Sequence, residues 1–461
     1  MRESILRKLQ EISGSKYVLT APEDLVCYGY DAQHVEHCPE AIVRAGSAEE
    51  VCAILHLANE EGLHVTPRGA GTGLSGGSVP AAGGLVLDLG RMNRIIEIDQ
   101  SNLLATVEPG VITADLASAV EAVGLMYPPD PGSIKVSTLG GNVAENAGGL
   151  RAIKYGVTAD YIKVIEGATP TGEFFKAGAV TMKSVAGYDL VHLLCGSEGT
   201  LAVFTKLTFK LLPLPKARRS MVGLFSQLTQ AAETVSAIIS AGIMPATLEI
   251  MDNVTIRTVE EFKKIGLPID AGAMLLLEVD GASAQVAEEA DKAASIMTSH
   301  NASEVQVAST HAERDRVWEA RRSALAALAR VRPTAILEDA TVPRSQLADM
   351  VSEINRIADK YSLTIGTFGH AGDGNLHPTI LTDQRDKEEM ARVEKAIEEI
   401  FNAALQLGGT VSGEHGIGFA KSRYLAREVG PGTLGMMRTI KSALDPKGIL
   451  NPGKIFTDQT T

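Results

Sequence analysis

The stretch that decides the fold is Pro67-Arg68-Gly69-Ala70-Gly71-Thr72-Gly73-Leu74-Ser75-Gly76-Gly77, which holds five glycines in eleven residues. It directly follows an expected strand at 63–66. Because glycine has no Cβ, consecutive backbone N–H groups can converge on phosphate oxygens, and Thr72 and Ser75 add hydroxyl donors. The loop therefore predicts a phosphate-cradling site. A glycine-rich surface turn is about as common for a single loop of this kind.

The residues after this loop exclude two familiar phosphate sites. In a nicotinamide-binding Rossmann unit a helix begins directly after the glycines, whereas 79–84 is another turn containing Pro and Gly. A P-loop closes with Gly-Lys-Ser or Gly-Lys-Thr, and neither occurs here. These residues therefore argue against a nicotinamide Rossmann site and against a P-loop.

The pattern of apolar residues predicts an α+β protein. A helix is expected at 47–62, because Ser47 can cap it just ahead of two glutamates. Residues 128–205 are dense in glycine, which is typical of tight turns, and the composition changes at the proline-containing segment 211–219. Strands are expected at 40–45, 64–69, 84–90, 104–110, 247–252, 272–281 and 362–372, and further helices at 226–242 and 284–300.

Composition excludes several classes of protein. A chain of 461 residues predicts two packed units or one domain with a large cap, and a net charge of −13 disfavours nucleic acid or an anionic membrane as partner. Four scattered cysteines give neither a disulfide framework nor an iron–sulfur signature. No apolar run reaches the about 18–20 residues of a membrane span, and the start reads as an amphipathic helix rather than a signal peptide. We expect a cytoplasmic protein, associated with a membrane only through a partner.

Seven motifs, in order along the chain, resemble those of the FAD-linked oxidases of the vanillyl-alcohol oxidase or p-cresol methylhydroxylase (PCMH) type. The resemblance is to the branch of glycolate oxidase D-subunits and D-lactate dehydrogenases. Seven ordered motifs are far more specific than one loop. They are PRGAGTGLSGG (67–77), PPDPGSIKVSTLGGNVAENAGGLRAIKYGVTADY (128–161), KSVAGYDL (183–190), GSEGTLAVFT (196–205), GHAGDGNLHP (369–378), GEHGIG (413–418) and LDPKGILNPGK (444–454).

The resemblance implies a two-subdomain FAD-binding domain of the PCMH type at 36–214, after an N-terminal helix and loop at 1–35. An α+β substrate (cap) domain is expected at 215–405. The C-terminal segment 406–461 would carry a catalytic loop and return to the FAD domain.

The same resemblance implies where FAD lies. Amide and hydroxyl side chains suit the polar edge of a flavin, and glycines allow close backbone approach. Some relatives attach FAD through a histidine near the first loop, but 67–77 contains none, so non-covalent FAD is expected. The expected cofactor residues are Pro67, Arg68, Gly69, Ala70, Gly71, Thr72, Gly73, Leu74, Ser75, Pro131, Ser137, Thr138, Gly140, Gly141, Asn142, Asn146, Gly148, Gly149, Tyr155, Gly156, Glu198, Gly199, Val203 and Asn451.

Histidines and a glutamate in two glycine-rich segments predict a metal site. His370 and His377 lie seven residues apart, and Glu414 precedes His415. Imidazole and carboxylate are ordinary ligands of Zn, Mn and Fe. The histidine pair alone is more often structural, but the second segment and the resemblance favour a divalent metal on His370, His377 and Glu414, with Asp373 supporting it.

His415 is the expected general base. If Glu414 and His415 lie on an extended segment, their side chains point in opposite directions and can have separate roles. A metal-bound 2-hydroxyl group is more acidic, and histidine is suited to take its proton near neutral pH. Hydride would then leave C2 of the substrate for flavin N5.

An arginine is expected to bind the substrate carboxylate. Arg321 lies three residues after Trp318, as in the relatives, and guanidinium binds carboxylate through two hydrogen bonds. Arg322 is better explained as a solvated helix residue. Relatives acting on D-2-hydroxyglutarate hold the substrate with a Lys and an Asn at the places of Leu337 and Thr379. This difference favours D-lactate first and glycolate next, with Thr379 facing the substrate.

The sequence leaves four functions open. The favoured one is an FAD-dependent D-2-hydroxy-acid dehydrogenase that passes electrons to an iron–sulfur subunit or an electron-transferring flavoprotein. An electron-relay subunit would need neither the metal residues nor Arg321. A D-2-hydroxyglutarate dehydrogenase, or a non-redox transferase related to alkyldihydroxyacetonephosphate synthase, are further alternatives.

Overall fold

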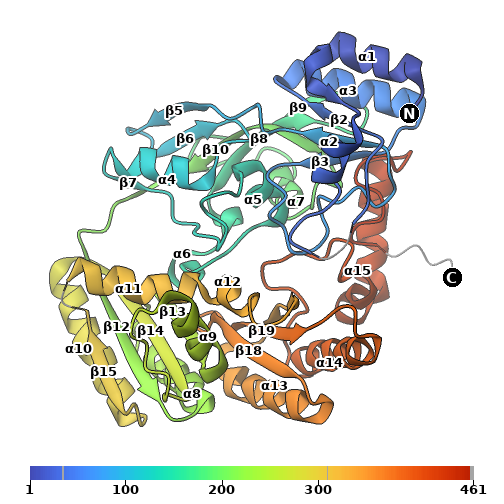
Figure 1. The fold of residues 1–461 in the computed structure, drawn as a ribbon. Helices are drawn as coiled ribbons and strands as arrows, with labels where there is room; N and C mark the ends of the chain where they lie inside the picture. Colours follow the sequence, from blue (N-terminus) through green and yellow to red (C-terminus); the bar gives the residue numbers. More distant parts are fainter. Residues whose placement is uncertain (34–35, 309, 457–461) are drawn as a thin grey trace. The chain divides into compact units, whose positions relative to one another are not determined.

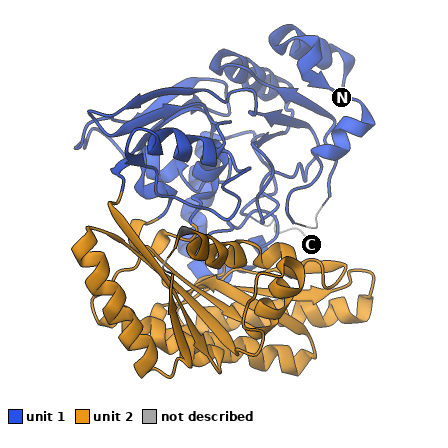
Figure 2. Cartoon of the chain, turned by 60° about the vertical axis from the view of Figure 1, so that its left-hand side comes forward, with its two compact units in different colours: residues 1–148, 157–214, 414–461 blue, residues 149–156, 215–413 orange. Residues whose placement is uncertain are grey.

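The computed structural model describes residues 1–33, 36–308 and 310–456. The chain divides into two compact units (Figure 2), unit 1 with residues 1–148, 157–214 and 414–461, and unit 2 with 149–156 and 215–413. The short segment 149–156 thus groups with unit 2, although the motif that contains it was expected in the FAD domain. Residues 406–413 also group with unit 2. The return to unit 1 begins at Glu414.

The described residues of unit 1 form two larger sheets (Figure 1) and a two-stranded sheet of β7 (Leu125–Met126) and β11 (Leu212–Pro213). In the first, β2, β4 and β3 are parallel and β1 is antiparallel. The helix expected at 47–62 forms α3, where the Ser47 hydroxyl accepts the N–H of Glu50 at 3.2 Å. The elements of this subdomain are α1 (Glu3–Ser13), β1 (Val18–Leu19), α2 (Pro22–Cys27), β2 (Ala41–Arg44), α3 (Ala48–Glu61), β3 (Val65–Arg68) and β4 (Leu85–Asp88).

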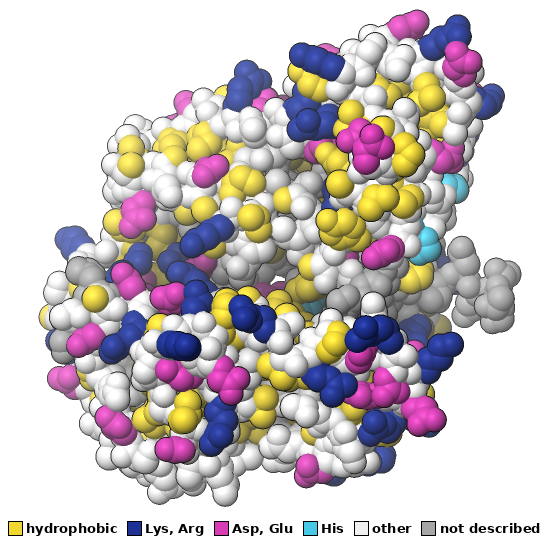
Figure 3. Space-filling model, viewed as in Figure 1, with side chains coloured by type: hydrophobic (Ala, Val, Ile, Leu, Met, Phe, Trp, Pro, Cys, Tyr) yellow, Lys and Arg dark blue, Asp and Glu magenta, His cyan; other side chains and the backbone are white. Residues whose placement is uncertain are grey.

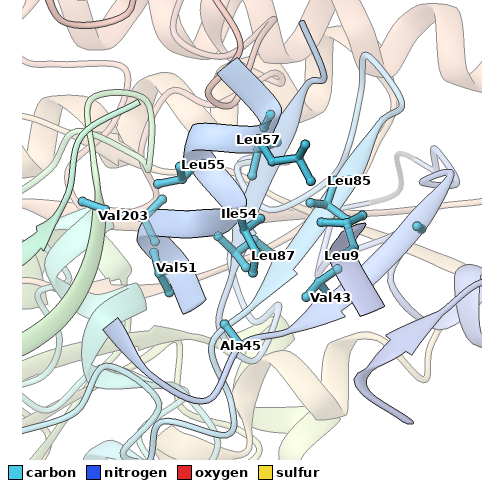
Figure 4. Close-up of a cluster of buried hydrophobic side chains, with 14 of the residues drawn as sticks. Leu9, Val43, Ala45, Val51, Ile54, Leu55, Leu57, Leu85, Leu87 and Val203 are labelled. Carbon is cyan, nitrogen blue, oxygen red and sulfur yellow. The ribbon is translucent and has the colours of Figure 1, made fainter. Parts of the chain in front are cut away.

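The core of this first subdomain explains its stability (Figure 4). Val51, Ile54 and Leu55 of α3 pack with Val43 and Leu87 of the sheet, and all five are fully buried. Burial of each large aliphatic side chain contributes about 1.5–3 kcal/mol. Leu450 belongs to the same core and forms a parallel bridge with Val65. The expected return of the C-terminal segment to the FAD domain is therefore confirmed.

The second subdomain is an antiparallel sheet of order β5-β6-β10-β8-β9. The glycine-dense region contains short helices as well as the expected turns, and no long helix. The elements are β5 (Ile95–Asp99), β6 (Leu104–Val107), α4 (Thr113–Glu121), β7 (Leu125–Met126), α5 (Leu139–Glu145), β8 (Ile162–Ala168), β9 (Phe174–Gly178), α7 (Leu190–Leu194), β10 (Val203–Lys210) and β11 (Leu212–Pro213), with α15 (Ser422–Leu444) following later in the chain.

Unit 2 is an eight-stranded sheet of order β15-β12-β14-β13-β18-β19-β16, with β17 paired to β19. The run AMLLLEVDG forms β14, whose first eight residues are buried, because both of its faces are covered. The strands are β12 (Ala217–Phe225), β13 (Thr247–Asp252), β14 (Ala273–Gly281), β15 (Glu304–Val307), β16 (Thr334–Leu337), β17 (Ala340–Thr341), β18 (Thr364–His370) and β19 (Asn375–Thr382). The helices are α6 (Ala152–Tyr155), α8 (Leu228–Ser240), α9 (Asn253–Lys263), α10 (Ser283–Ser299), α11 (His311–Arg322), α12 (Ala324–Leu328), α13 (Leu347–Tyr361) and α14 (Lys387–Gln406).

The distribution of surface charges and the state of the cysteines are those that the composition indicates. On the face of unit 2 seen in Figure 3, Lys and Arg are interspersed with Asp and Glu. All four cysteines are free thiols. Among the described residues, no helix is both long and apolar enough to cross a bilayer.

Candidate active site

The glycine-rich loop leaves the end of β3 with its backbone donors available. Among the described residues, none accepts a hydrogen bond from the N–H groups of residues 69–75. Gly71 has φ +68°, a conformation that glycine adopts without strain. A Cβ on Gly69 would overlap the Thr138 hydroxyl, so the loop lies directly against the start of α5.

Side chains of the second expected cofactor segment are largely used to hold its own shape. Asn142 donates to the Thr113 hydroxyl at 2.7 Å, and Ser137 shares a hydroxyl contact with Thr113 at 3.0 Å. Thr138 caps α5. Asn146 ends α5 in the left-handed region, with its side-chain oxygen accepting the N–H of Ala159 at 2.8 Å. These side chains therefore shape the segment, and close approach to a ligand falls to the backbone.

The C-terminal segment reaches the glycine-rich loop inside unit 1. The Asn451 amide donates to the carbonyls of Gly77 at 2.9 Å and of Glu198 at 2.8 Å. Its own oxygen is buried and has no partner, and the same is true of the Ser75 hydroxyl. Leaving such polar atoms unpaired costs about 1–3 kcal/mol each, so both indicate a place where a polar ligand belongs.

Two expected cofactor residues, Tyr155 and Val203, have other roles. The Tyr155 hydroxyl donates to Asp280 at 2.8 Å within unit 2, and Lys154 pairs with the same carboxylate. These bonds explain why 149–156 groups with unit 2. Val203 lies in the core of unit 1 and is only 1% exposed, so its side chain contributes to packing.

A cluster of buried carboxyl groups holds the segment after His415. Glu198 accepts the N–H groups of Ile417 at 2.7 Å and Gly418 at 2.5 Å. Burial raises the pKa of Glu145 well above its ordinary range, and the neighbouring Glu198 carboxylate raises it further. Burial also raises the pKa of Asp31 to about 6. Glu198 keeps the favourable N–H donors, so Glu145 is the member of the pair that carries a proton.

His370 and His377 lie on adjacent antiparallel strands of unit 2. A four-residue turn joins β18 to β19, and Gly374 takes φ +85° within it. The ring centroids of the two histidines are 5.1 Å apart, and a ligand nitrogen of one lies within 4.8 Å of a ligand nitrogen of the other. Both side chains are buried. The turn thus brings together the pair that sequence spacing suggested.

A buried glutamate links one of these histidines to the expected substrate arginine. Glu249 on β13 is fully buried, and its two oxygens accept from His370 Nδ1 at 2.7 Å and from Arg321 Nε at 2.5 Å. Glu249 lies outside every motif that pointed to the site. The available signal was an acidic residue within the apolar strand TLEIMD. Arg321 is buried in the last turn of α11, shortly before the alanine-rich helix α12 that was expected to follow it, whereas Arg322 is exposed.

Expectations were also made for Thr379 on β19 and for the adjacent residues Glu414 and His415. Thr379 is fully buried and pairs across strands with Leu337, so the two places compared with hydroxyglutarate-oxidising relatives are neighbours. Glu414 and His415 lie in a series of bends, not on an extended strand, so the argument from alternating side chains does not apply. In the chain, Glu414 directly follows Gly413, the last residue of unit 2. Within unit 1, a Cβ on Gly148 would lie 3.2 Å from the Glu414 carboxylate.

Two known families match consecutive parts of the chain. The FAD binding domain family matches residues 39–178, and the family of FAD linked oxidases, C-terminal domain, matches residues 214–455. The chain belongs to the FAD-linked oxidases. The fold class and the enzyme class expected from the seven motifs are thereby confirmed.

Relatives of this FAD-linked oxidase cover nearly its whole length. Glycolate oxidase subunit GlcD of Bacillus subtilis (strain 168) is 48% identical over 98% of this chain and 97% of its own. D-lactate dehydrogenase of Anaerostipes hadrus is 37% identical over 98% of this chain and 97% of its own. The solved structure of p-cresol methylhydroxylase with substrate bound has a TM-score of 0.79 at 19% identity, covering 99% of this chain and 96% of that one, which shows the shared fold.

The residues of unit 1 in this FAD-linked oxidase fit FAD. Unpaired N–H groups along residues 69–75 suit the anionic pyrophosphate, as expected of a glycine-rich phosphate loop. The buried, partnerless oxygens of Ser75 and Asn451 suit polar groups of the same ligand. The glycine-rich loop, the start of α5 and the C-terminal segment therefore form one cradle within unit 1.

Proposed function

We propose that this FAD-linked oxidase oxidises a small D-2-hydroxy acid with one carboxylate to the 2-oxo acid. The names of the relatives support this class, because one is a glycolate oxidase subunit and another a D-lactate dehydrogenase. Leu337, an apolar residue opposite Thr379, favours a substrate without a second carboxylate. D-lactate and glycolate are therefore the two substrates to compare first, ahead of D-2-hydroxyglutarate.

The main support for the proposal is the buried guanidinium of Arg321. Glu249 accepts hydrogen bonds both from this guanidinium and from one member of the histidine pair. A buried cation suits the carboxylate of a small acid, since guanidinium forms two parallel hydrogen bonds with it. Thr379, on the same strand as His377, would contact the remainder of the substrate. An electron-relay subunit has no use for this arrangement.

His370, His377 and Glu414 are the residues that we propose as ligands of a divalent Zn, Mn or Fe ion. Two imidazoles and a carboxylate form a donor set that such ions accept. The ion would make the 2-hydroxyl group of the substrate more acidic. His415, next to Glu414 in the chain, would take the proton from that hydroxyl.

FAD supplies the two-electron acceptor for the C2–H bond of the substrate. The chain itself contributes the cradle of unit 1, which fixes the cofactor, and the cation of Arg321, which fixes the orientation of the acid. Because the four cysteines are separate free thiols, we propose that electrons leave to a partner, either an iron–sulfur subunit or an electron-transferring flavoprotein. A cytoplasmic location, with membrane contact only through that partner, completes the proposal.

An anaerobic flavin-reduction panel tests the function. The purified holoenzyme would be mixed with D-lactate, L-lactate, glycolate, D-2-hydroxybutyrate and D-2-hydroxyglutarate, with and without a chelator. We expect bleaching of the flavin by D-lactate or glycolate, with a slower rate after chelation. No bleaching by any of these acids would overturn the proposal and leave the relay subunit or the transferase, and reduction that chelation leaves unchanged would remove the metal role.

A further inference from the structure

Glu249 occupies an unusual place in unit 2, because a single fully buried carboxylate serves two cationic or proton-donating partners. Its Oε1 contacts His370 Nδ1 at 2.7 Å, and its Oε2 contacts Arg321 Nε at 2.5 Å. The three residues come from β18, β13 and α11. A buried charge is tolerated only when it is paired and hydrogen-bonded, and here both oxygens are used.

The contact to His370 fixes which ring nitrogen is protonated. A carboxylate only accepts hydrogen bonds, so Nδ1 of His370 carries the proton and donates it. The lone pair of a neutral imidazole is then on Nε2, which is the state required of a metal ligand. Carboxylates in this position both orient a ligating histidine and raise its basicity.

The contact to Arg321 fixes the orientation of a guanidinium. Glu249 uses the Nε–H side of the fork, and the Phe368 ring lies 4.7 Å from the guanidinium carbon. The two terminal amino groups are the part of the fork left to hold a substrate carboxylate. The side chain is 8% exposed, so its direction is set by these two contacts.

We propose that Glu249 is a positioning residue that couples metal binding to substrate binding, because it orients His370 toward the metal and Arg321 toward the substrate carboxylate. The inference rests on the proposed function above and adds to it a residue shared by both halves of the site. Loss of this one carboxylate should weaken metal and acid together.

The variant Glu249→Gln separates this role from mere packing. Glutamine has the shape of glutamate but offers one acceptor oxygen and one NH2 donor. Its oxygen can therefore accept a hydrogen bond from either His370 or Arg321. Its NH2 group then faces the N–H donor of the other residue. Glu278 provides a matched control on the adjacent strand, since it is buried and accepts from Ser220 at 2.6 Å and Trp318 at 3.2 Å, with no contact to His370 or Arg321.

The experiment measures two affinities on the oxidised holoenzyme. Zn²⁺ and Mn²⁺ affinities come from competition with a chromogenic chelator, and affinity for pyruvate, a 2-oxo acid, comes from perturbation of the flavin spectrum. For Glu249→Gln we expect metal affinity to fall 10- to 100-fold and pyruvate affinity to fall about tenfold. Glu278→Gln should keep both within about twofold.

A spectroscopic measurement tests the contact between Glu249 and His370 in the absence of metal. In the metal-free protein labelled with 15N-histidine, the His370 resonances, assigned by their loss in His370→Ala, should report the Nδ1–H form, and Glu249→Gln should shift them. Glu249→Asp keeps the charge but is one methylene shorter, so it should weaken both affinities even if the glutamine variant folds poorly.

Each outcome supports or overturns the inference. Wild-type affinities for metal and pyruvate in both Glu249 variants would overturn it, as would equal losses in Glu278→Gln. If D-lactate and glycolate fail to reduce the wild-type flavin while Glu249→Gln still weakens metal and pyruvate binding, the proposed reaction fails and the positioning role stands. A wild-type protein that binds neither Zn²⁺ nor Mn²⁺ overturns the coupling together with the proposed metal site.

Discussion

Glu198 accepts the backbone N–H of Gly418 at 2.5 Å, across 220 residues of sequence. The same carboxylate accepts the N–H of Ile417, and a Cβ on Gly416 would lie 3.2 Å from it. One buried carboxylate thereby fastens the segment that follows His415 to the body of unit 1. The position of the proposed base depends on this attachment, although the two motifs involved are distant in the chain.

Replacing Glu198 by Gln should loosen that attachment. Glutamine leaves one of the two N–H groups facing an NH2 group, so the free energy of unfolding should fall by about 1–3 kcal/mol. Urea unfolding, together with the flavin content after gel filtration, measures the effect. Glu166→Gln is the control, because Glu166 pairs with exposed Lys206 and Lys176 and such pairs contribute less than about 1 kcal/mol. Equal losses in both variants would contradict the assignment.

The close approach of Gly69 to Thr138 should make this glycine indispensable for FAD. A Cβ would overlap the hydroxyl that caps α5 and would push the glycine-rich loop away from it. We expect Gly69→Ala to lose most bound FAD during purification, measured from the ratio of flavin to protein absorbance. Gly132→Ala is the matched control, since no atom lies within 4 Å of the place that its new methyl group would take. Full FAD occupancy in Gly69→Ala would show that the loop does not hold the pyrophosphate.

Arg321 should contribute to substrate binding, whereas the neighbouring Arg322 should not. Lysine keeps the charge of Arg321 but loses the planar fork, so kcat/KM for the accepted acid should fall by about 10- to 100-fold, which corresponds to about 1.4–2.8 kcal/mol. Arg322→Lys changes an exposed side chain one residue later and should leave kcat/KM unaltered. Steady-state kinetics with an artificial acceptor would decide, and a similar loss in both variants would point to a helix effect.

Loss of His377 should separate metal binding from FAD binding. The side chain belongs to unit 2, whereas the FAD cradle belongs to unit 1. We expect His377→Ala to retain FAD, to lose its equivalent of metal, and to be reduced by the substrate more than about tenfold more slowly. Metal analysis and stopped-flow absorbance measure these quantities. His56→Ala, with a side chain 63% exposed, serves as control. Unchanged metal content in His377→Ala would remove this histidine from the ligand set.

The buried carboxyl of Asp31 predicts a pH dependence of stability. Burial raises its pKa from 3.8 to about 6, so the folded state binds this proton more tightly than the unfolded chain does. The stability contributed by protonated Asp31 is complete below about pH 4 and is lost as the pH rises through 6. The Asp31→Asn variant has no carboxyl group that titrates at this position. As the pH rises across this range, its free energy of unfolding should therefore increase relative to that of the wild type, by up to roughly 3 kcal/mol.

Urea titrations at pH 4.5, 6 and 7.5 measure the difference, and Asp115→Asn, at an exposed position, should run parallel to wild type. A constant gap between Asp31→Asn and wild type would contradict the raised pKa.

The sequence by itself determined the family and much of the first subdomain, although β1 and α2 lie in a stretch that was expected to be a loop. The glycine-rich loop, the capped helix at Ser47 and the strands around them depend on local preferences of a few adjacent residues. The histidine pair could be predicted as well, because glycines between His370 and His377 permit a tight turn that returns the chain onto the neighbouring strand.

Only the tertiary structure decided which side chains hold one another in place. Glu249 lies 72 residues from Arg321 and 121 residues from His370, and Tyr155 is committed to Asp280, 125 residues away. No local pattern encodes such pairs, since they form when strands and helices from distant parts of the chain pack together. Burial then makes each unpaired polar atom costly, and this cost explains why Glu249 and Glu198, which motif reasoning overlooked or placed only beside the nucleotide, organise the site.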